Sequence, residues 1–501
     1  MELQTAHAMT GMSALPSELI AHIFTFFDDT DVFATRQTCH AIERASIAHF
    51  GHRFFRKIGF MITTPSLNTL TSISNHKDLR KYVQHVWFNP DCFTFIRPDC
   101  APDPQDEPPN PSEPDSILQL LSPSDRKSYM AYQTVKRDHS RLLHACGKEL
   151  QQVLISIFAT LPNLKIIGMR RSEDHAPWGW KALQSAVGQD PRELGPPPSG
   201  PSSSLSAPTK LFLAIVNAVA VTDIKLRRFY TDAIEIDNIR PEFLTQATLD
   251  KACGSIWYLE LNVSRAWLMQ CNAHTYSRVT DEENYGDGLV KLLKATTELR
   301  EIGLQIFPSL QQDYKPELRA RGRPETWRKT MSYLCMRNVV QNVQLSNLTR
   351  VKLEKIITSP DMLVQLLEPS AENLTSLKLR DIRLLSDDDN PKPWRTFFAF
   401  LLDSCPKLDF LLFYHLLHEG GGVAFIQGQQ PDPGEMSIPE RLASGHGAFR
   451  PYEDITLQVS GREEVKVKLG EVVDEHYYDQ PGYSYELDDR EWHTDTSDEE
   501  R

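Results

Sequence analysis

A short apolar pattern recurs along the central part of the chain. Its skeleton is apolar-x-x-apolar-x-apolar, and its clearest copies are "NLTRVKLEKI" at 347–356 and "NLTSLKLRDI" at 373–382, which match in register. The alternation in the second half of each copy is typical of a short strand with one buried face. Seven copies predict seven strands, and the other five have their apolar positions at Val83, Val86 and Phe88; Leu164, Ile167 and Met169; Ile256, Leu259 and Leu261; Leu299, Ile302 and Leu304; and Leu408, Leu411 and Phe413.

Helix-like segments precede several of these strands. They are "GDGLVKLLKAT" at 286–296, "SPDMLVQLLEPS" at 359–370 and "WRTFFAFLLDSC" at 394–405. Helices and strands that alternate in this way, with every strand in the same orientation, favour a right-handed solenoid with a parallel sheet on one face. We therefore expect an α/β fold whose repeat-like body covers residues 51–417.

Proline-rich and polar stretches interrupt or follow this body. "RPDCAPDPQDEPPNPSEPD" at 97–115 and "DPRELGPPPSGPSSSLSAP" at 190–208 predict mobile insertions, because proline removes backbone donors and these stretches bury little. Residues 418–453 are expected to form a loop region. Residues 454–470 contain "ITLQVSGREEVKVKLG", whose alternation on either side of a polar turn predicts a β-hairpin. Residues 471–501 are expected to be an acidic, disordered tail.

The N-terminal stretch "LPSELIAHIFTFFDDTDVFATRQTCHAIERAS", residues 15–46, predicts three short helices after a disordered start at 1–12. Pro16 suits a first helical turn, where no backbone donor is needed. Asp28 to Asp31 would end the first helix and cap the second. Leu15, Leu19, Ile23 and Phe27 would share one helical face. Three helices of this size cannot enclose so many apolar side chains, so part of this surface must be covered from outside.

The order Leu-Pro-x-Glu-Leu, Ile-Phe, Asp-aliphatic, Arg and Cys in residues 13–50 resembles the F-box, which docks onto the Skp1 adaptor of cullin-RING ubiquitin ligases. The body resembles an irregular leucine-rich-repeat array, although its spacings vary and the customary Asn or Cys after the strand is mostly missing. By position, the resemblance assigns Skp1 contacts to Leu15, Pro16, Leu19, Ile23, Phe24, Val32, Arg36 and Cys39.

Together, the two resemblances imply a non-catalytic substrate-recognition subunit of a Skp1-cullin-F-box ligase, similar to a large fungal set of such proteins. Its partners would be a Skp1-type adaptor, through it a cullin, and a target protein. The target would meet the side chains that alternate with the buried ones, namely Trp87, Tyr258, Glu260, Asn262, Lys352, Glu354, Lys378, Arg380 and Tyr414. Two alternatives stay open: a repeat scaffold that uses the helices as its own cap, and an F-box adaptor that acts outside a ligase.

The net charge and the apolar runs of the sequence limit the partners and the cellular location that we expect. The net charge of −13 argues against nucleic acid and acidic membranes as partners, since both attract Lys and Arg. The chain has no secretory signal pattern, and its longest apolar run, at 211–221, is too short to cross a bilayer, so we expect a cytoplasmic or nuclear protein.

The sequence also lacks the usual motifs of metal sites and of enzymes. Eight scattered cysteines without a CxxC pair predict reduced thiols and no metal site. Phosphate-loop and Gly-x-Ser-x-Gly patterns are absent, so we expect no cofactor and no enzyme activity. An enzyme with a site dispersed along the sequence is the remaining rival. Two tryptophans in "HAPWGWKAL" at 175–183 either anchor a ligand or tuck their loop against the body.

Overall fold

The computed structural model describes residue 12 and residues 15–90, 123–170, 176–188, 205–264 except 233, 237, 238, 240 and 241, 286–307, 323–385, 393–418, 421–425, 456–474 and 477–481. The chain forms two compact units, Met1–Pro324 and Glu325–Arg501, and each is considered by itself. The predicted insertion at 97–115 lies outside the described residues.

The first unit begins with four short helices: α1 (Ser17–Phe24), α2 (Asp29–Arg36), α3 (His40–Ala45) and α4 (Ile47–Phe54). Pro16 precedes α1, and the Asp28 carboxylate caps α2 by accepting a 2.7 Å bond from the Asp31 amide. Both features were expected from the sequence. The fourth helix extends the unit beyond the three that were predicted.

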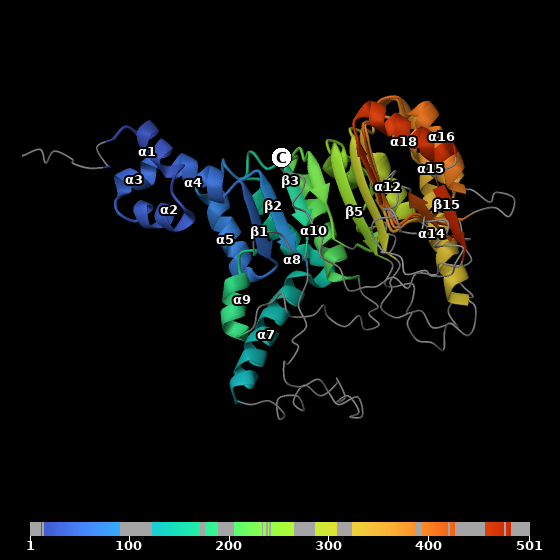
Figure 1. Cartoon of the computed structure of the whole chain (residues 1–501). Coiled ribbons are helices and arrows are strands. Elements are labelled where there is room, and N and C mark those ends of the chain that lie inside the picture. The colour runs from blue at the N-terminus through green and yellow to red at the C-terminus, as the bar shows by residue number, and fades with distance from the viewer. Residues whose placement is uncertain are drawn as a thin grey trace, which may run out of the picture. The chain divides into compact units, whose positions relative to one another are not determined.

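A parallel sheet of six strands follows: β1 (Lys57–Met61), β2 (His85–Asn89), β3 (Ile166–Met169), β4 (Arg228–Tyr230), β5 (Tyr258–Ser264) and β6 (Glu301–Phe307). Each strand pairs in parallel with the next one along the chain (Figure 1). The four strands predicted in this region are confirmed as β2, β3, β5 and β6, while β1 and β4 were missed. In β4 the skeleton ends on Thr231 instead of an apolar residue, so the pattern is incomplete.

Helices cross over between the strands: α5 (Thr64–Asn75), α7 (Pro123–Leu142), α8 (His144–Phe158), α9 (Trp180–Val187), α10 (Ala207–Thr222), α11 (Gln246–Cys253) and α12 (Asp287–Ala295). Consecutive crossover helices pack side by side, α5 on α8, α8 on α10, α10 on α11 and α11 on α12. The apolar run at 211–221 belongs to α10, most of whose residues are buried. Its hydrophobicity therefore reflects burial between neighbouring helices.

The two tryptophans of 175–183 behave differently. Trp180 begins α9 and is buried with Met61 and Tyr132, so it tucks its segment against the sheet. Trp178 forms a single bridge on the outer edge of β1, where its amide donates to Gly59 O at 2.7 Å and its carbonyl accepts from the Met61 amide at 3.1 Å. Its ring stacks on Phe60 and stays 47% exposed. This bridge shields an otherwise open sheet edge.

The second unit contains two sheets. In the first, β7 (Arg350–Glu354), β9 (Ser376–Arg380) and β11 (Phe410–Tyr414) pair in parallel, and β14 (Thr456–Ser460) pairs antiparallel with β11. These parallel strands confirm the three copies predicted here. The helical segments of the unit are α14 (Arg323–Asn342), which begins just before it, α15 (Pro360–Leu367), the 3-10 segment η7 (Glu368–Asn373), α16 (Pro393–Ser404) and α18 (Arg462–Asp474). The three helices predicted at 286–296, 359–370 and 394–405 are confirmed as α12, α15 and α16.

Each parallel strand of this unit turns through one left-handed residue into a shorter strand. The corner residues are Lys355, Asp381 and His415, with φ of 54°, 54° and 52°. They lead into β8 (Ile357–Thr358), β10 (Arg383–Leu384) and β12 (Leu417–His418), which stack in the order β8-β10-β12. His415 Nδ1 lies 2.7 Å from Asp381 Oδ1, so neighbouring corners contact each other. The three corners are therefore equivalent positions of a repeated unit.

The hairpin predicted at 454–470 is wrong. Its first half is β14, but Gly461 (φ 100°) ends the strand, and residues 462–474 form α18. Val465, Leu469 and Val472 are buried, whereas Val467 is 58% exposed. The spacing of four and three residues is helical, and Glu463 and Glu464 supply first-turn acids that favour a helix.

Three other segment boundaries also need correction. Residues 477–481 of the predicted disordered tail form β15 (Tyr477–Pro481), which pairs antiparallel with β13 (Gly421–Phe425) inside the predicted loop region. The predicted insertion at 190–208 reaches into the start of α10, where the Ser206 hydroxyl accepts a bond from the Thr209 amide. In each case a short element gains partners from a sheet or cap that local composition does not reveal.

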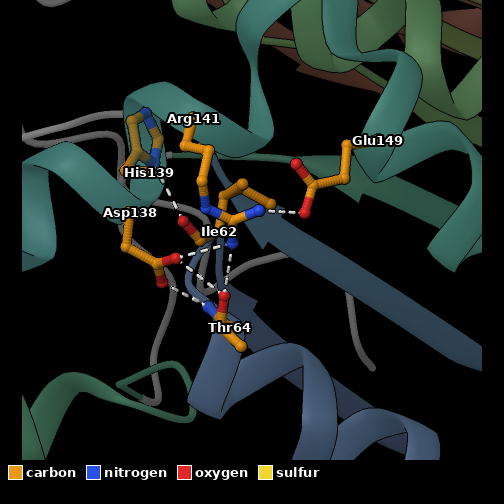
Figure 2. A network of polar contacts seen from close by, with 6 residues as sticks. All are labelled: Ile62, Thr64, Asp138, His139, Arg141 and Glu149. Atoms are coloured by element: carbon orange, nitrogen blue, oxygen red, sulfur yellow. Dashed lines mark hydrogen bonds and ion pairs between the residues drawn. The ribbon is translucent and has the colours of Figure 1, made fainter.

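A polar network fixes α7 to the start of α5 (Figure 2). Asp138 accepts bonds from the amide and hydroxyl of Thr64, at 2.6 and 2.7 Å, and from Arg141 at 2.9 Å. Arg141 also pairs with Glu149. The Asp138 carboxylate thus caps α5 from another helix and satisfies an amide that has no partner within α5. Next to it, His139 Nδ1 donates to Ile62 O at 3.1 Å.

We expect acidification to destabilise the first unit through His139. The side chain is 5% exposed, and burial lowers its pKa to about 4. The folded state therefore keeps it neutral, while the unfolded chain binds a proton below its ordinary pKa of about 6.5. Stability is fully present above pH 6.5 and falls until pH 4, by about 2 kcal/mol between pH 7 and pH 5. Urea unfolding over this pH range measures the loss.

His139→Asn separates this contribution from that of His85, whose pKa burial lowers to about 3 and which titrates in the unfolded chain over the same range. An asparagine amide can donate to Ile62 O but takes up no proton here. The variant should lose about 2 kcal/mol less than the parent chain between pH 7 and pH 5. Equal slopes for the two proteins would contradict the assignment.

Candidate functional site

The four N-terminal helices enclose a small apolar core. Ile20, Phe24, Val32 and Ile42 are at most 6% exposed and pack together. Partly buried side chains complete this cluster: Met12, Phe27, Ala45, Phe50 and Phe54. Phe24 is fully buried, and its ring centroid lies 5.3 Å from that of Phe27. The core therefore uses one face of each of the first three helices.

Large apolar side chains remain outside this core. Leu15, Leu19, Phe26 and Phe33 are 37%, 50%, 76% and 46% exposed. Single exposed apolar residues are common on proteins, but four within twenty residues form an unusual concentration. The surplus of apolar surface inferred from the sequence is thus present in the structure.

The structure divides the predicted adaptor-contact residues into two groups. Leu15, Pro16, Leu19 and Cys39 are exposed and Ile23 is half-buried, so a partner can reach them. Phe24 and Val32 are fully buried, so the contact expected for them is wrong for this conformation. They support the surface from beneath. A sequence motif specifies only the type of each residue, so it does not separate the exposed apolar residues from the buried ones.

Arg36 has a bonding role inside the helical unit. Its Nη1 donates to Glu43 O at 2.9 Å and to Ser46 Oγ at 2.7 Å, and its guanidinium lies 3.9 Å from the centroid of the Phe50 ring. It therefore links α2 to the segment that joins α3 and α4. A partner that contacted Arg36 would compete with these intramolecular bonds for its half-buried guanidinium group.

The family model of the F-box domain matches residues 12–46, which span α1 to α3 and the helical core just described. The chain contains an F-box domain. This agrees with the resemblance inferred for residues 13–50. No curated protein sequence matches the chain.

The F-box is attached to the sheet through α4. A Cβ on Gly51 would lie 2.1 Å from Tyr82 Cδ2, so the ring of the loop before β2 rests directly on the helix backbone. The His52 and Tyr82 rings meet edge to face at 4.9 Å. On the F-box side, Arg53 donates to Phe27 O at 2.7 Å and pairs with Asp29. These contacts connect the F-box to the body without a flexible linker among the described residues.

The sheet face predicted to bind a target is largely covered in the first unit. Trp87 is 2% exposed, so its predicted role as an outward anchor is wrong. Its indole lies on Gly59, where a Cβ would come within 2.0 Å of Trp87 Cε2. Met61, on the same face of β1, is covered by α7 and α9. Tyr230, on β4, lies on Gly168 in the same manner, with a Cβ position 1.8 Å from Tyr230 Cζ.

A chain of polar contacts crosses this face from β2 to β5. His85 Nε2 lies 2.9 Å from the Tyr230 hydroxyl, and Arg170 stacks over the Tyr230 ring at 4.5 Å. Arg170 also donates to Glu260 at 3.0 Å, and the Tyr258 hydroxyl donates to the same carboxylate oxygen. Burial is the main cause that lowers the pKa of His85 to about 3. Tyr258 and Glu260 are therefore held by neighbours within the sheet.

Sequence reasoning missed the other members of this chain of contacts, His85, Arg170 and Tyr230. A signal was available for His85, because it alternates with the buried Val86 on a predicted strand, whereas Tyr230 lies on β4, whose pattern is incomplete. Asn262, the remaining predicted residue of this unit, is half-buried and contributes backbone bonds to Thr231 and Ile234.

The corresponding face of the second unit is more open and carries mostly positive charge. We call it the basic face and define it by Arg350, Lys352, Glu354, Lys378, Arg380, Phe410 and Tyr414. The residues between them, such as Leu353 and Leu379, are fully buried on the opposite side of the sheet. Arg350 is exposed, and the side chains of Lys352 and Arg380 are 38% and 54% exposed. The predicted positions Lys352, Glu354, Lys378, Arg380 and Tyr414 thus share one accessible surface.

Two searches of the described residues bear on other site types. They contain no group of three or more His, Cys, Asp or Glu side chains that could hold a metal ion. None of their helices is long and apolar enough to span a bilayer. Burial raises the pKa of the Cys253 and Cys405 thiols to about 12, so both are poor nucleophiles at neutral pH.

Proposed function

We propose that the protein is a non-catalytic substrate-recruiting subunit of a Skp1-cullin-F-box ubiquitin ligase. The F-box would bind a Skp1-type adaptor through Leu15, Pro16, Leu19 and Ile23, with Cys39 at the margin. The body would bind a target protein and hold it near the ubiquitin-charged enzyme that the cullin carries. Positioning of this kind accelerates transfer by raising effective concentration, and it needs no reacting group from this chain.

The observation that carries the proposal is an F-box domain whose first helix leaves large apolar side chains exposed. Leu19 is 50% exposed and lies on α1, the helix whose Ile20 and Phe24 are buried in the core. Burying such side chains in a partner's groove yields about 25 cal/mol for each Å² removed from water. A rigid helix that presents them also loses little entropy on binding.

For the body we propose an irregular solenoid of the leucine-rich-repeat kind. Support comes from parallel strands in chain order in the first unit, and from the stacked corners at Lys355, Asp381 and His415 in the second. Solenoids present extended faces to partners, which suits target recognition. The basic face is the accessible part of such a surface.

Leu19→Asp is expected to weaken binding to a purified Skp1-type adaptor about 30-fold, which corresponds to about 2 kcal/mol for a central interface residue. The physical reason is that a carboxylate would be desolvated at an apolar contact. Titration calorimetry measures the change, and co-purification with a cullin tests assembly into a ligase.

Val467→Asp is the matched control, because Val467 is 58% exposed on α18 of the second unit. It places the same charge at an equally exposed apolar position and should leave adaptor affinity unchanged. Wild-type affinity in Leu19→Asp would refute the adaptor contact. Adaptor binding without any cullin in the purified complex would favour an F-box adaptor that acts outside a ligase.

A further inference from the structure

The basic face concentrates positive charge on a chain that is negative overall. Its seven residues comprise four cations, one carboxylate and two aromatic rings, whereas the whole chain has a net charge of −13. Strand register places Lys352 directly beside Lys378, and it places Arg380 between Glu354 and Tyr414. Like charges at neighbouring positions of a sheet repel each other, so this register favours an anionic ligand on the face.

On the basic face, each of the two aromatic rings lies beside a cation. Lys378 Nζ lies 5.5 Å from the centroid of the Phe410 ring, and the Arg380 guanidinium lies 5.1 Å from that of Tyr414. Lys352 Nζ lies 3.4 Å from Glu354, and Arg380 Nε lies 3.6 Å from Asp381 at the adjoining corner. The seven residues of the face sum to a charge of +3, and Asp381 offsets one of these charges. Partly exposed rings beside cations provide both apolar contact and charge, which are the features that bind an acidic peptide containing aromatic residues.

The chain itself contains such a peptide, and it follows an element of the same unit. Residues 486–501, "ELDDREWHTDTSDEER", hold eight acids and two arginines, and Tyr483, Tyr485 and Trp492 lie in or just before this stretch. The peptide continues from β15, which is fixed to β13 by antiparallel pairing. Residues 482–501 can span at most about 70 Å when extended, which exceeds the size of a unit of this length.

We propose that the basic face binds the chain's own C-terminal segment, residues 482–501. Attachment through β15 gives this segment a local concentration of the order of millimolar, so weak charge pairing is enough for occupancy. A target's acidic segment would then have to displace it. The consequence for target recruitment rests on the proposed function, but binding of the segment does not, and a failure of the Leu19→Asp test would leave it unaffected.

The test uses the full chain, a variant that ends at Pro481, and a fluorescent synthetic peptide with the sequence of residues 482–501. Fluorescence anisotropy should show that the shortened chain binds the peptide at least tenfold more tightly than the full chain, where the face is already occupied. Raising the salt concentration from 50 to 300 mM should weaken binding, because the contact is mainly ionic. Equal affinity for both chains, or no binding to either, would overturn the proposal.

Charge reversal locates the site. Lys378→Glu combined with Arg380→Glu in the shortened chain should weaken peptide binding at least tenfold. Arg462→Glu combined with Lys466→Glu, at exposed positions of α18, is the matched control and should not change it. Thermal unfolding of both double variants checks that each remains folded. An equal loss of binding in the two would show that only net charge matters and would overturn the assignment to the basic face.

Two further measurements test whether the C-terminal segment occupies the basic face in the full chain, and whether this face prefers the peptide to nucleic acid. Carbodiimide treatment of the monomeric full chain should join a tail carboxylate to Lys352 or Lys378, as mapped by mass spectrometry, and tail links found only to other lysines would overturn the proposal. A single-stranded DNA of twenty nucleotides should bind the shortened chain more weakly than the peptide does. Tighter binding of the DNA would identify the face as a nucleic-acid site instead.

Discussion

Replacing Phe24 with alanine is expected to unfold the F-box while the sheet of the first unit stays folded. Phe24 is fully buried among Ile20, Val32 and Ile42, and removal of such a ring costs about 3–5 kcal/mol. A helical unit of about forty residues has only a few kcal/mol of stability of its own, so the loss is comparable to the whole. Hydrogen exchange, analysed by peptide, should show lost protection in α1 to α3 with protection retained in β2 and β3.

Phe26→Ala is the matched control, because Phe26 is two residues away and 76% exposed. It should change stability by no more than about 0.5 kcal/mol. Phe24→Ala should also abolish adaptor binding, although its side chain is too buried to contact a partner. Retained protection in α1 to α3 of Phe24→Ala would show that packing against the body, through Gly51 and Tyr82, stabilises the F-box more than its own core does.

The strands were predictable because their pattern is local. In all seven copies the two apolar positions inside the strand point into the core, and two-residue alternation is enough to reveal a buried face. The first strand was missed although Phe55, Ile58 and Phe60 fit the skeleton, since it follows the F-box helices without a break in composition.

The errors arose where a pattern fits two structures. Val465 and Leu469 satisfy both a two-residue and a four-residue period, and only the burial of Val472 and the exposure of Val467 separate helix from strand. Trp87 alternates correctly with Val86 and Phe88, yet the outward face of β2 is itself covered. Which side of a sheet meets solvent depends on residues distant in sequence, here Gly59 under the Trp87 indole and helices α7 and α9 over Met61, and no local pattern encodes it.

The F-box illustrates the same limit at the level of a site. The motif identified its apolar residues, but the core residue Phe24 and the surface residue Leu19 have similar side chains. Burial in three dimensions separates them, 0% against 50% exposed. A sequence motif therefore identifies the domain better than it separates the surface residues of that domain from its core.

Gly168→Val is expected to destabilise the first unit by about 3 kcal/mol or more. Gly168 lies in the middle of β3, and a Cβ there would be 1.8 Å from Tyr230 Cζ, far inside contact distance. The ring cannot move outward without losing the His85 and Arg170 contacts that hold it. Glycine in a strand normally weakens it, so its presence here is explained by the aromatic ring that rests on the backbone. Urea unfolding measures the loss.

A double-mutant cycle distinguishes this crowding from a general intolerance of β3. Tyr230→Ala alone removes the ring and should cost about 3–5 kcal/mol through the cavity it leaves. Added to Gly168→Val it also removes the clash, so the double variant should be more stable than the sum of the single losses by about 1–3 kcal/mol. Gly470→Ala, in α18 with no heavy atom within 4 Å of its Cβ position, should be neutral or stabilising. Strict additivity of the two β-sheet substitutions would mean that the ring does not rest on Gly168 in solution.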